Sequence, residues 1–330
     1  MSSNGANVLL VGQLYQDFIL HVDEFPAEDA KKRASKLEIR SGGNCGNTLM
    51  VLSQLPNVQT WCMTSLGPKE EAGSMLLGLE NQGVNTSTCV FHDHGVNPSS
   101  YVIHASNTGT RTIISYNEAQ DITLTDYQQR VEKAMSDTKQ HFTWVHFEGR
   151  NIDNAVQQID WMHDKAIKEN WRDRLTISVE LEKPDRENID ALLDKGDVVF
   201  FSKLFAEKRG FSDASSFLKA YSVRCRPNSI LFCTWGAQGA TCLQRATSQI
   251  LSAPALNIDQ VVDTVGAGDT FTAGVIYGLS HGFNLLDVLT FSCELAGRKV
   301  AQTGFDQLQQ QLDARWNNAL FYDSVDRAIT

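Results

Sequence analysis

Short apolar runs alternate along the chain with segments whose apolar positions have helical spacing. Val8 to Val11 is an apolar run that ends at Gly12, as a buried strand does. From Trp144 onward, strand-like and helical segments follow one another regularly. Because such alternation builds a parallel sheet, the pattern predicts an α/β fold with a mostly parallel sheet flanked by helices. The expected strands are 8–11, 61–65, 144–147, 175–181, 197–201 and 230–234, and the expected helices are 44–55, 70–82, 152–166 and 270–281.

Four further segments are strand-like but do not fit this alternation: 18–22, 34–40, 101–104 and 111–115. We interpret them as a small β-sheet lid, built from residues 13–40 and 96–116. One face of such a sheet is left uncovered, and two copies can cover it mutually around a two-fold axis. We therefore expect a homodimer formed through the lid. No linker divides the chain, so residues 1–330 are expected to form one domain, with a C-terminal extension at 307–330.

Charge and composition narrow the possible functions. The 330 residues include 29 Lys and Arg against 39 Asp and Glu, a formal net charge of −10. This balance argues against nucleic-acid binding, which needs basic patches. No basic segment precedes the first apolar run, so this run does not resemble a signal peptide. The longest uncharged stretch, 41–68, is too polar for a membrane span. The seven cysteines form no Cys-x-x-Cys pair, so we expect reduced thiols, a cytoplasmic location and no protein-built metal centre.

The segment from Val262 to Phe271 carries the strongest chemical signal. Gly266, Ala267 and Gly268 leave their backbone N–H groups uncovered just where a helix is expected to begin. Backbone amides at a helix N-terminus bind anions through free donors and the helix dipole. Asp269 follows at a position from which it can meet a nucleophile that attacks a bound phosphate. The alternative interpretation is a tight turn in which the acidic residues only cap the helix.

A second glycine-rich segment, from Ser41 to Asn47, precedes the first long helix. Asn44 and Asn47 are three residues apart, so their amides project from one helix face. Each amide can donate or accept a hydrogen bond, which suits the recognition of several hydroxyl groups. Asp17 and Asp29 can be supplied from nearby loops. The alternative interpretation is a helix cap followed by a solvated asparagine.

In this order and at this separation, the two motifs resemble those of the ribokinase-like (PfkB) family of carbohydrate kinases. The run Asp-Thr-Val-Gly-Ala-Gly-Asp at 263–269 is a specific signature of that family. Within the family, the chain is most similar to the kinases that phosphorylate ketohexoses. The similarity extends from about Val8 to about Asp306, and its supporting segments are 26–29, 109–113, 146–151, 179–184, 196–200 and 304–306.

This resemblance implies an ATP-dependent kinase that phosphorylates D-fructose on its terminal hydroxymethyl group, giving fructose 1-phosphate. It implies that Asp269 is the general base and that the amides of Gly266, Ala267 and Gly268 stabilise the transferring phosphoryl group. The implied sugar-binding residues are Asp17, Gly43, Asn44 and Asn47, joined by Asp29 from the same or the partner subunit's lid. The implied nucleotide-binding residues are Arg111, Gly236, Ala237, Gln238 and Gly239.

The resemblance also implies the cofactors. MgATP brings its own metal ion, so no dedicated metal cage is needed, and K⁺ remains open as a further ion. Many relatives carry Asn-x-x-Glu after the strand that here ends at Phe201, whereas this chain has Ser202-Lys203-Leu204-Phe205. Because this chain lacks the motif, the motif cannot be used to assign the residues that bind Mg²⁺. Glu180 and Glu182 lie two residues apart near a strand end and face the same side, and we expect one of them to help order Mg²⁺.

Two alternatives to a ketohexose kinase remain open on the sequence. One is a related kinase with another acceptor, such as ribose, adenosine or a sugar acid. The other is a catalytically silent sugar-binding or regulatory protein on the same scaffold. The intact Asp269 favours an enzyme, because a silent protein has no chemical need for a base. The helix N-terminus is expected to lower the pKa of this aspartate.

Overall fold

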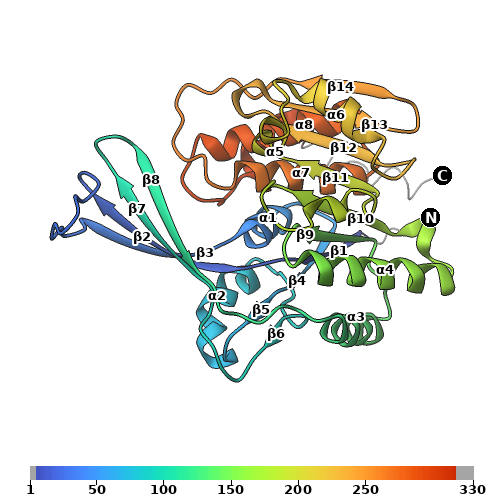
Figure 1. Ribbon diagram of the computed structural model, residues 1–330, viewed down its shortest axis with the longest axis horizontal. Coiled ribbons are helices and arrows are strands. Elements are labelled where there is room, and N and C mark those ends of the chain that lie inside the picture. Colours follow the sequence, from blue (N-terminus) through green and yellow to red (C-terminus); the bar gives the residue numbers. More distant parts are fainter. Residues whose placement is uncertain (1–4, 317–330) are drawn as a thin grey trace.

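The structure, a computed structural model, describes residues 5–316; the rest of the extension expected at 307–330 lies outside the described residues. Within this range, an eight-stranded sheet forms the centre of the molecule, in the order β14-β13-β12-β11-β10-β9-β1-β4 (Figure 1). The strands from β4 to β12 run parallel, and the last two add antiparallel at one edge. Their bounds are β1 Ala6–Val11, β4 Val58–Met63, β9 Trp144–Glu148, β10 Thr176–Leu181, β11 Val198–Phe201, β12 Ile230–Thr234, β13 Ala240–Gln244 and β14 Gln249–Ala253.

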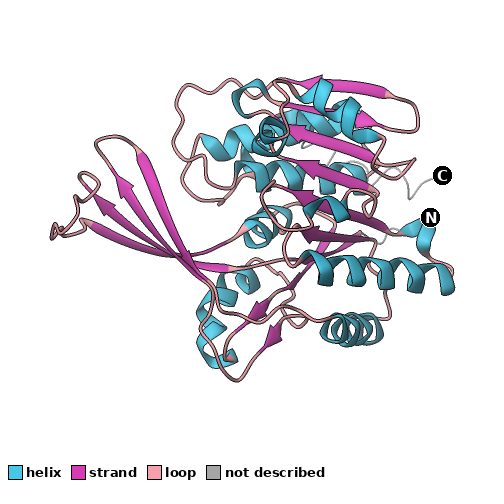
Figure 2. Cartoon of the chain, in the orientation of Figure 1, coloured by secondary structure: helices cyan, strands magenta, loops and turns pink. Residues whose placement is uncertain are grey.

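Helices cover both faces of this sheet (Figure 2). Successive strand residues point to opposite faces, so Val8 and Leu10 join one apolar cluster while Leu9 and Val11 join the other. The first cluster packs under α1 (Asn44–Leu52), α2 (Lys69–Asn81), α7 (Ala267–Ser280) and α8 (Leu285–Val300). The second packs under α3 (Leu124–Thr138), α4 (Ile152–Lys168), α5 (Lys203–Lys208) and α6 (Ala214–Ser222). The α/β class expected from the sequence is confirmed.

A second sheet of four strands, in the order β3-β2-β7-β8, stands away from the main body (Figure 1). β2 follows β1 directly, and β3 leads into α1. The small sheet is therefore attached to the main body at the carboxyl ends of the parallel strands. We call this sheet the lid. It matches the small sheet expected from the sequence, and its strands are β2 Tyr15–Val22, β3 Lys36–Gly42, β7 Ser99–Ala105 and β8 Thr110–Tyr116.

The sequence pattern missed several elements. The antiparallel hairpin of β13 and β14 was not expected, and neither were α3, α5, α6 and α8. In α3, the buried Tyr127, Val131 and Ala134 follow helical spacing, and Thr123 and Asp126 form a capping box, so the sequence did carry signals for this helix. The structure also contains β5 (Ser65–Leu66) paired with β6 (Val90–Phe91), and short 3₁₀ segments at Arg172–Arg174, Ile189–Leu192, Gly236–Gln238 and Gln309–Gln311. Within residues 5–316, no helix is both long enough and apolar enough to cross a membrane.

Candidate active site

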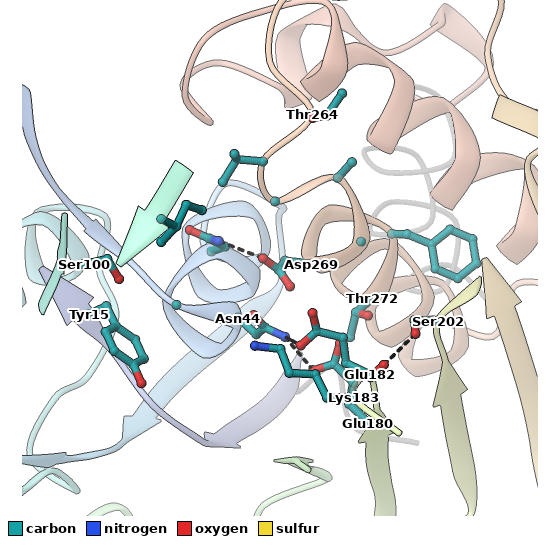
Figure 3. Close-up of a pocket in the computed structure, with 18 of the residues that line it drawn as sticks. Tyr15, Asn44, Ser100, Glu180, Glu182, Lys183, Ser202, Thr264, Asp269 and Thr272 are labelled. Carbon is teal, nitrogen blue, oxygen red and sulfur yellow. Dashed lines mark hydrogen bonds between the residues drawn. The ribbon is translucent and has the colours of Figure 1, made fainter. Parts of the chain in front are cut away.

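A cavity of about 600 Å³ lies between the lid and the carboxyl ends of the parallel strands (Figure 3). Open parallel sheets place their ligand sites at this edge, because the strand ends and the following loops converge there. Polar residues expected from the sequence line the cavity from four directions. Asp17 comes from β2, Asn44 and Asn47 from α1, Arg111 from β8, and Gly266 to Asp269 from the start of α7.

Asp269 lies in the first turn of α7 and is buried. The side-chain amide of Asn47 donates a hydrogen bond of 2.7 Å to its carboxylate, and the hydroxyl of Thr48 contacts its backbone carbonyl at 3.3 Å. Burial raises the pKa of Asp269 to about 7, and the charges of Glu182 and Glu148 add to this effect. The Asn47 bond and the charge of Lys299 oppose it. The carboxylate can therefore accept a proton near neutral pH.

This result corrects the low pKa expected for Asp269. The expectation considered only the helix N-terminus, which stabilises the charged form. The structure adds desolvation and nearby carboxylates, and both favour the neutral form. For a group this deeply buried, desolvation outweighs the dipole.

The turn before α7 brings small residues to a helix N-terminus, the place where the sequence predicts an anion-binding site. Gly266 is the residue before the helix and adopts a left-handed conformation, with φ of +78°. The first bond of the helix ladder runs from Thr270 N–H to the Gly266 carbonyl, so the amides of residues 267–269 precede the ladder. The Ala267 amide contacts the Thr264 carbonyl at 3.3 Å. A Cβ atom on Gly268 would meet no atom within 4 Å, so this part of the turn is open to a ligand.

Carboxylates gather on the opposite wall of the cavity. Glu180 is the second-to-last residue of β10, and Glu182 follows the strand. The Asn44 amide nitrogen lies 3.3 Å from a carboxylate oxygen of Glu180 and 3.0 Å from one of Glu182 (Figure 3). Burial and the charges of Asp269, Glu182 and Glu148 raise the pKa of Glu180 well above its usual value. A cluster of like charges in a cavity is stabilised by a cation. Within residues 5–316, no group of three or more His, Cys, Asp or Glu side chains could hold a metal ion alone.

The lid supplies both acidic and basic groups to the cavity. Asp17 is mostly buried, and burial raises its pKa, while the charge of Arg40 and a hydrogen bond from Ser100 oppose the shift. Gly43 has φ of +87°, and a Cβ atom there would lie 2.4 Å from the Gln13 carbonyl, so the start of α1 requires glycine. The Arg111 guanidinium lies 2.5 Å from a carboxylate oxygen of Asp263, which joins the lid to the turn before α7.

A second cavity, of about 630 Å³, lies on the other side of this turn. Gly236, Ala237 and Gly239 line it, whereas Gln238 of the same loop is exposed and does not. Apolar side chains, among them Leu256, Val261 and Val300, form most of the remaining wall. The two cavities share Thr234, Thr264, Ala267, Gly268 and Phe271.

Asp29 is the one expected sugar-binding residue that lies away from its own cavity. It is exposed in the loop between β2 and β3 at the far end of the lid, and it does not line the cavity. Its backbone is left-handed, with φ of +59°.

Sequence reasoning missed several charged residues that the structure brings to the site: Arg150 and Lys183, which line the cavity, and Glu148, Arg40 and Lys299. Glu148 ends β9 and accepts the backbone N–H of Gln13. Arg40 lines the cavity from the lid, and Lys299 lies behind the turn, next to Asp263. One signal was available for Lys299. It follows Val288, Ser292 and Leu295 at the spacing of a buried helix stripe, where a lysine is out of place.

The site therefore joins two cavities at the glycine-containing turn that leads into Asp269. One cavity is polar, lined by amide, carboxylate and guanidinium groups, and the other is largely apolar. A donor in the apolar cavity and an acceptor in the polar one would meet at the turn. This arrangement defines an enzyme that transfers an anionic group to an acceptor hydroxyl.

Comparison with known proteins identifies which transferase family has this arrangement. Residues 6–311 match the pfkB family of carbohydrate kinases, and the chain belongs to that family. It is thus an ATP-dependent carbohydrate kinase. Ketohexokinase from Mus musculus is 35% identical over 299 residues, which cover 91% of this chain and 97% of that protein.

Solved structures of the family share the fold. Ribokinase from Giardia lamblia superposes with a TM-score of 0.74 at 17% identity, covering 91% of this chain and 94% of that one. Ribokinase from Arabidopsis thaliana, solved with ribose and ATP, superposes with a TM-score of 0.69 at 17% identity and covers 91% of this chain and 94% of that one. The family resemblance inferred from the motifs is confirmed.

Proposed function

We propose that this kinase transfers the γ-phosphoryl group of ATP to the terminal hydroxymethyl group of a ketohexose, D-fructose, giving fructose 1-phosphate. The observation that carries the proposal is the buried pair of Asn47 and Asp269 beside the anion-binding turn, within a cavity lined by amides and carboxylates. The choice of a ketohexose is supported by the 35% identity to mouse ketohexokinase over nearly its whole length.

In the proposed reaction, fructose lies in the polar cavity, held by Asp17, Asn44, Asn47 and the backbone at Gly43. Asp269 accepts the proton of the attacking hydroxyl as that oxygen forms its bond to the γ-phosphorus. The bond from the γ-phosphorus to the bridging oxygen breaks, and ADP leaves with its electron pair. A pKa of about 7 for Asp269 suits a base that works at neutral pH.

The turn and the lid would stabilise the transferring group. The amides of Gly266, Ala267 and Gly268 face the phosphoryl oxygens in this proposal, where positioning and charge neutralisation supply most of the rate. Arg111 pairs with Asp263, and a guanidinium has five N–H donors, so it retains donors for a phosphate. Gly236, Ala237 and Gly239 would form the wall beside the nucleotide, with Gln238 acting only through the loop backbone.

Mg²⁺ fits this site as the ion of MgATP. Glu180 and Glu182 are neighbouring carboxylates that share one amide donor, and a bound cation would offset their mutual repulsion. Mg²⁺ is commonly held by one or two carboxylates together with substrate phosphates. When bound, it would neutralise phosphate charge. For K⁺, a comparison of turnover in potassium and tetramethylammonium buffers decides whether a monovalent ion is needed.

We also propose a homodimer formed through the lid, in which Asp29 reaches the partner's sugar site. The strand register places Tyr101 beside Phe18 and Ile114, and Phe18 beside Ile39, so these side chains share the lid face turned away from the cavity. Ile39 and Ile114 are 55% and 60% exposed, an unusual amount for apolar strand residues. A second copy of the lid is the proposed cover. The seven cysteines are free thiols, which supports the proposed cytoplasmic location.

An ADP-release assay over a panel of acceptors tests the proposed function. The panel contains fructose and other ketohexoses, ribose, adenosine and a sugar acid, each with MgATP. The expected result is the highest kcat/KM with fructose and 1-phosphate as the product by NMR. A higher kcat/KM with ribose or adenosine would assign another acceptor, and binding of fructose without ADP release would indicate a silent sugar-binding protein.

A further inference from the structure

Lys299 is a fully buried lysine in the last turn of α8, with 0% of its surface exposed. Its ammonium nitrogen lies 2.9 Å from Oδ2 of Asp263 and donates a 3.1 Å hydrogen bond to the backbone carbonyl of the same residue. Burial lowers the pKa of Lys299, while the hydrogen bond and the charge of Asp263 oppose this shift and favour the ammonium form. Burying a charge is costly, and its partner, Asp263, is the first residue of the anion-binding motif.

The same region of α8 holds this motif through the backbone. The N–H groups of Val262 and Asp263 both donate to the Val300 carbonyl, at 2.9 and 3.1 Å. Oδ1 of Asp263 in turn accepts the N–H of Val265 at 3.0 Å, which shapes the turn itself. Residues 299 and 300 of α8 thus hold the start of the turn through hydrogen bonds.

Phe305 packs against both Lys299 and the turn. The lysine nitrogen lies 5.1 Å from the centre of the Phe305 ring, a cation–π contact. The same ring packs against Gly266, where an added Cβ atom would lie 2.4 Å from it. The ammonium, the ring and the turn therefore form one packed unit.

We propose that Lys299 is a positioning residue, which holds the turn 263–268 in its anion-binding shape and places a fixed positive charge behind it. Asp263 also contacts Arg111 and Arg40, at 2.5 and 3.8 Å, but both of these cations come from the lid. Lys299 belongs to the main body, so its hold on the turn does not depend on where the lid lies. The proposal rests on phosphoryl transfer at this turn.

The charge of Lys299 also acts on the candidate base. It lowers the pKa of Asp269, against the raising effects of burial and of Glu182 and Glu148, while the Asn47 amide acts in the same direction as the lysine. Glu180 also interacts with Asp269 through its charge. From the α8 side, the positive charge of Lys299 thus opposes the effect of these carboxylates on the pKa of Asp269.

The test begins with Lys299→Met, which keeps the length of the side chain and removes its charge. The matched control is Arg298→Met, which removes a neighbouring cation whose partners, Glu294 and Asp313, line neither cavity. Lys299→Met is expected to lower kcat about 100-fold, the cost of misplacing the reacting groups by about 1 Å. The KM for the sugar should change less than about three-fold, because the sugar-binding residues lie on α1 and the lid. Arg298→Met should keep the wild-type kcat.

Two further measurements separate positioning from mere stability. In Lys299→Ala, methylammonium is expected to restore turnover in a saturable way, whereas tetramethylammonium, which has no N–H donor, should not. In the double variant Lys299→Met with Asp263→Asn, both buried charges are gone, so the melting temperature should recover while kcat stays low. All variants are compared with the wild type in two assays, phosphorylation of the acceptor that the panel identifies and ATP hydrolysis without an acceptor. The comparison therefore holds even if the acceptor is not fructose.

A wild-type kcat in Lys299→Met would overturn the proposal. So would recovery of kcat together with the melting temperature in the double variant, because the lysine would then only neutralise Asp263. Restoration of kcat in Lys299→Ala by tetramethylammonium as well as by methylammonium would likewise overturn it, because filling the space without an N–H donor would then be enough.

Discussion

The side-chain amide of Asn47 donates a 2.7 Å hydrogen bond to Oδ2 of Asp269, across 222 positions of the sequence. The two residues lie on α1 and α7, which pack against each other at the edge of the cavity. The bond orients the carboxylate and stabilises its charged form, in opposition to burial. A residue expected only to hold the sugar thus also tunes the candidate base.

Asn47→Leu removes this donor at similar volume and is expected to move the pH profile. Asp269 acts as a base only when deprotonated, so kcat/KM should rise with pH through a pKa of about 7 in the wild type. Without the amide, the charged form is less favoured, and the acid limb should move to higher pH. Profiles of kcat/KM between pH 5 and 9 measure the shift. A limb at unchanged or lower pH would contradict this assignment of the bond.

Asp269→Asn is expected to keep the fold and the sugar affinity but to lower turnover by about 10²–10⁴-fold, because the amide preserves shape and cannot accept the proton. Asp259→Asn, an exposed change of the same kind in the preceding loop, is the control. Steady-state rates and calorimetric fructose binding give the two readouts. Near-normal turnover in a variant that binds fructose would remove Asp269 from the role of base.

Asn44→Ala is expected to weaken fructose binding. In the proposed complex its amide bonds hydroxyl groups of the sugar, and the variant loses these bonds. In the structure the amide nitrogen lies within hydrogen-bond distance of both Glu180 and Glu182. The expected loss is about 1–3 kcal/mol in affinity, or roughly 5- to 150-fold. Titration of fructose into the protein measures it, and an unchanged Kd would place the sugar elsewhere.

Ile114→Glu puts a charge on the apolar lid face and is expected to give a monomer. The wild type should have a solution mass near twice 36.6 kDa, measured by light scattering. Val223→Glu is the matched control, because Val223 is 72% exposed but lies at the end of α6, away from the lid. A wild-type protein that is monomeric at micromolar concentration would rule out the proposed dimer.

Mixed dimers test whether Asp29 serves the partner's site. Asp29→Ala subunits are mixed with Asp269→Asn subunits, neither of which should be fully active alone. If Asp29 acts across the dimer, each mixed dimer has one intact site and one site with both defects. Activity should then recover to about one site per mixed dimer. If mixing restores nothing, Asp29 does not act in the partner's site.

Local sequence was enough to predict the turn and the helix after it, because Gly266 and Gly268 act through their own backbone. It was also enough for the lid strands, whose alternation is local. The pKa of Asp269 could not be predicted this way, since it depends on burial and on Glu148 and Glu182, which lie far away in the sequence. The contacts of Arg40 and Lys299 with Asp263 could not be predicted either, because they form only when the lid and α8 pack around the turn.

The turn at 264–268 forms a common wall of the two cavities, so ligands on its two sides are separated by only a few backbone atoms. A single compound that joins a sugar analogue to a nucleoside through a short phosphate tether could fill both. Once one end is bound, the other is held near its cavity at a high effective concentration, of the order of millimolar for a short linker. Such a bisubstrate ligand would gain affinity from the tether itself, and its optimal length would measure the path along which the phosphoryl group travels.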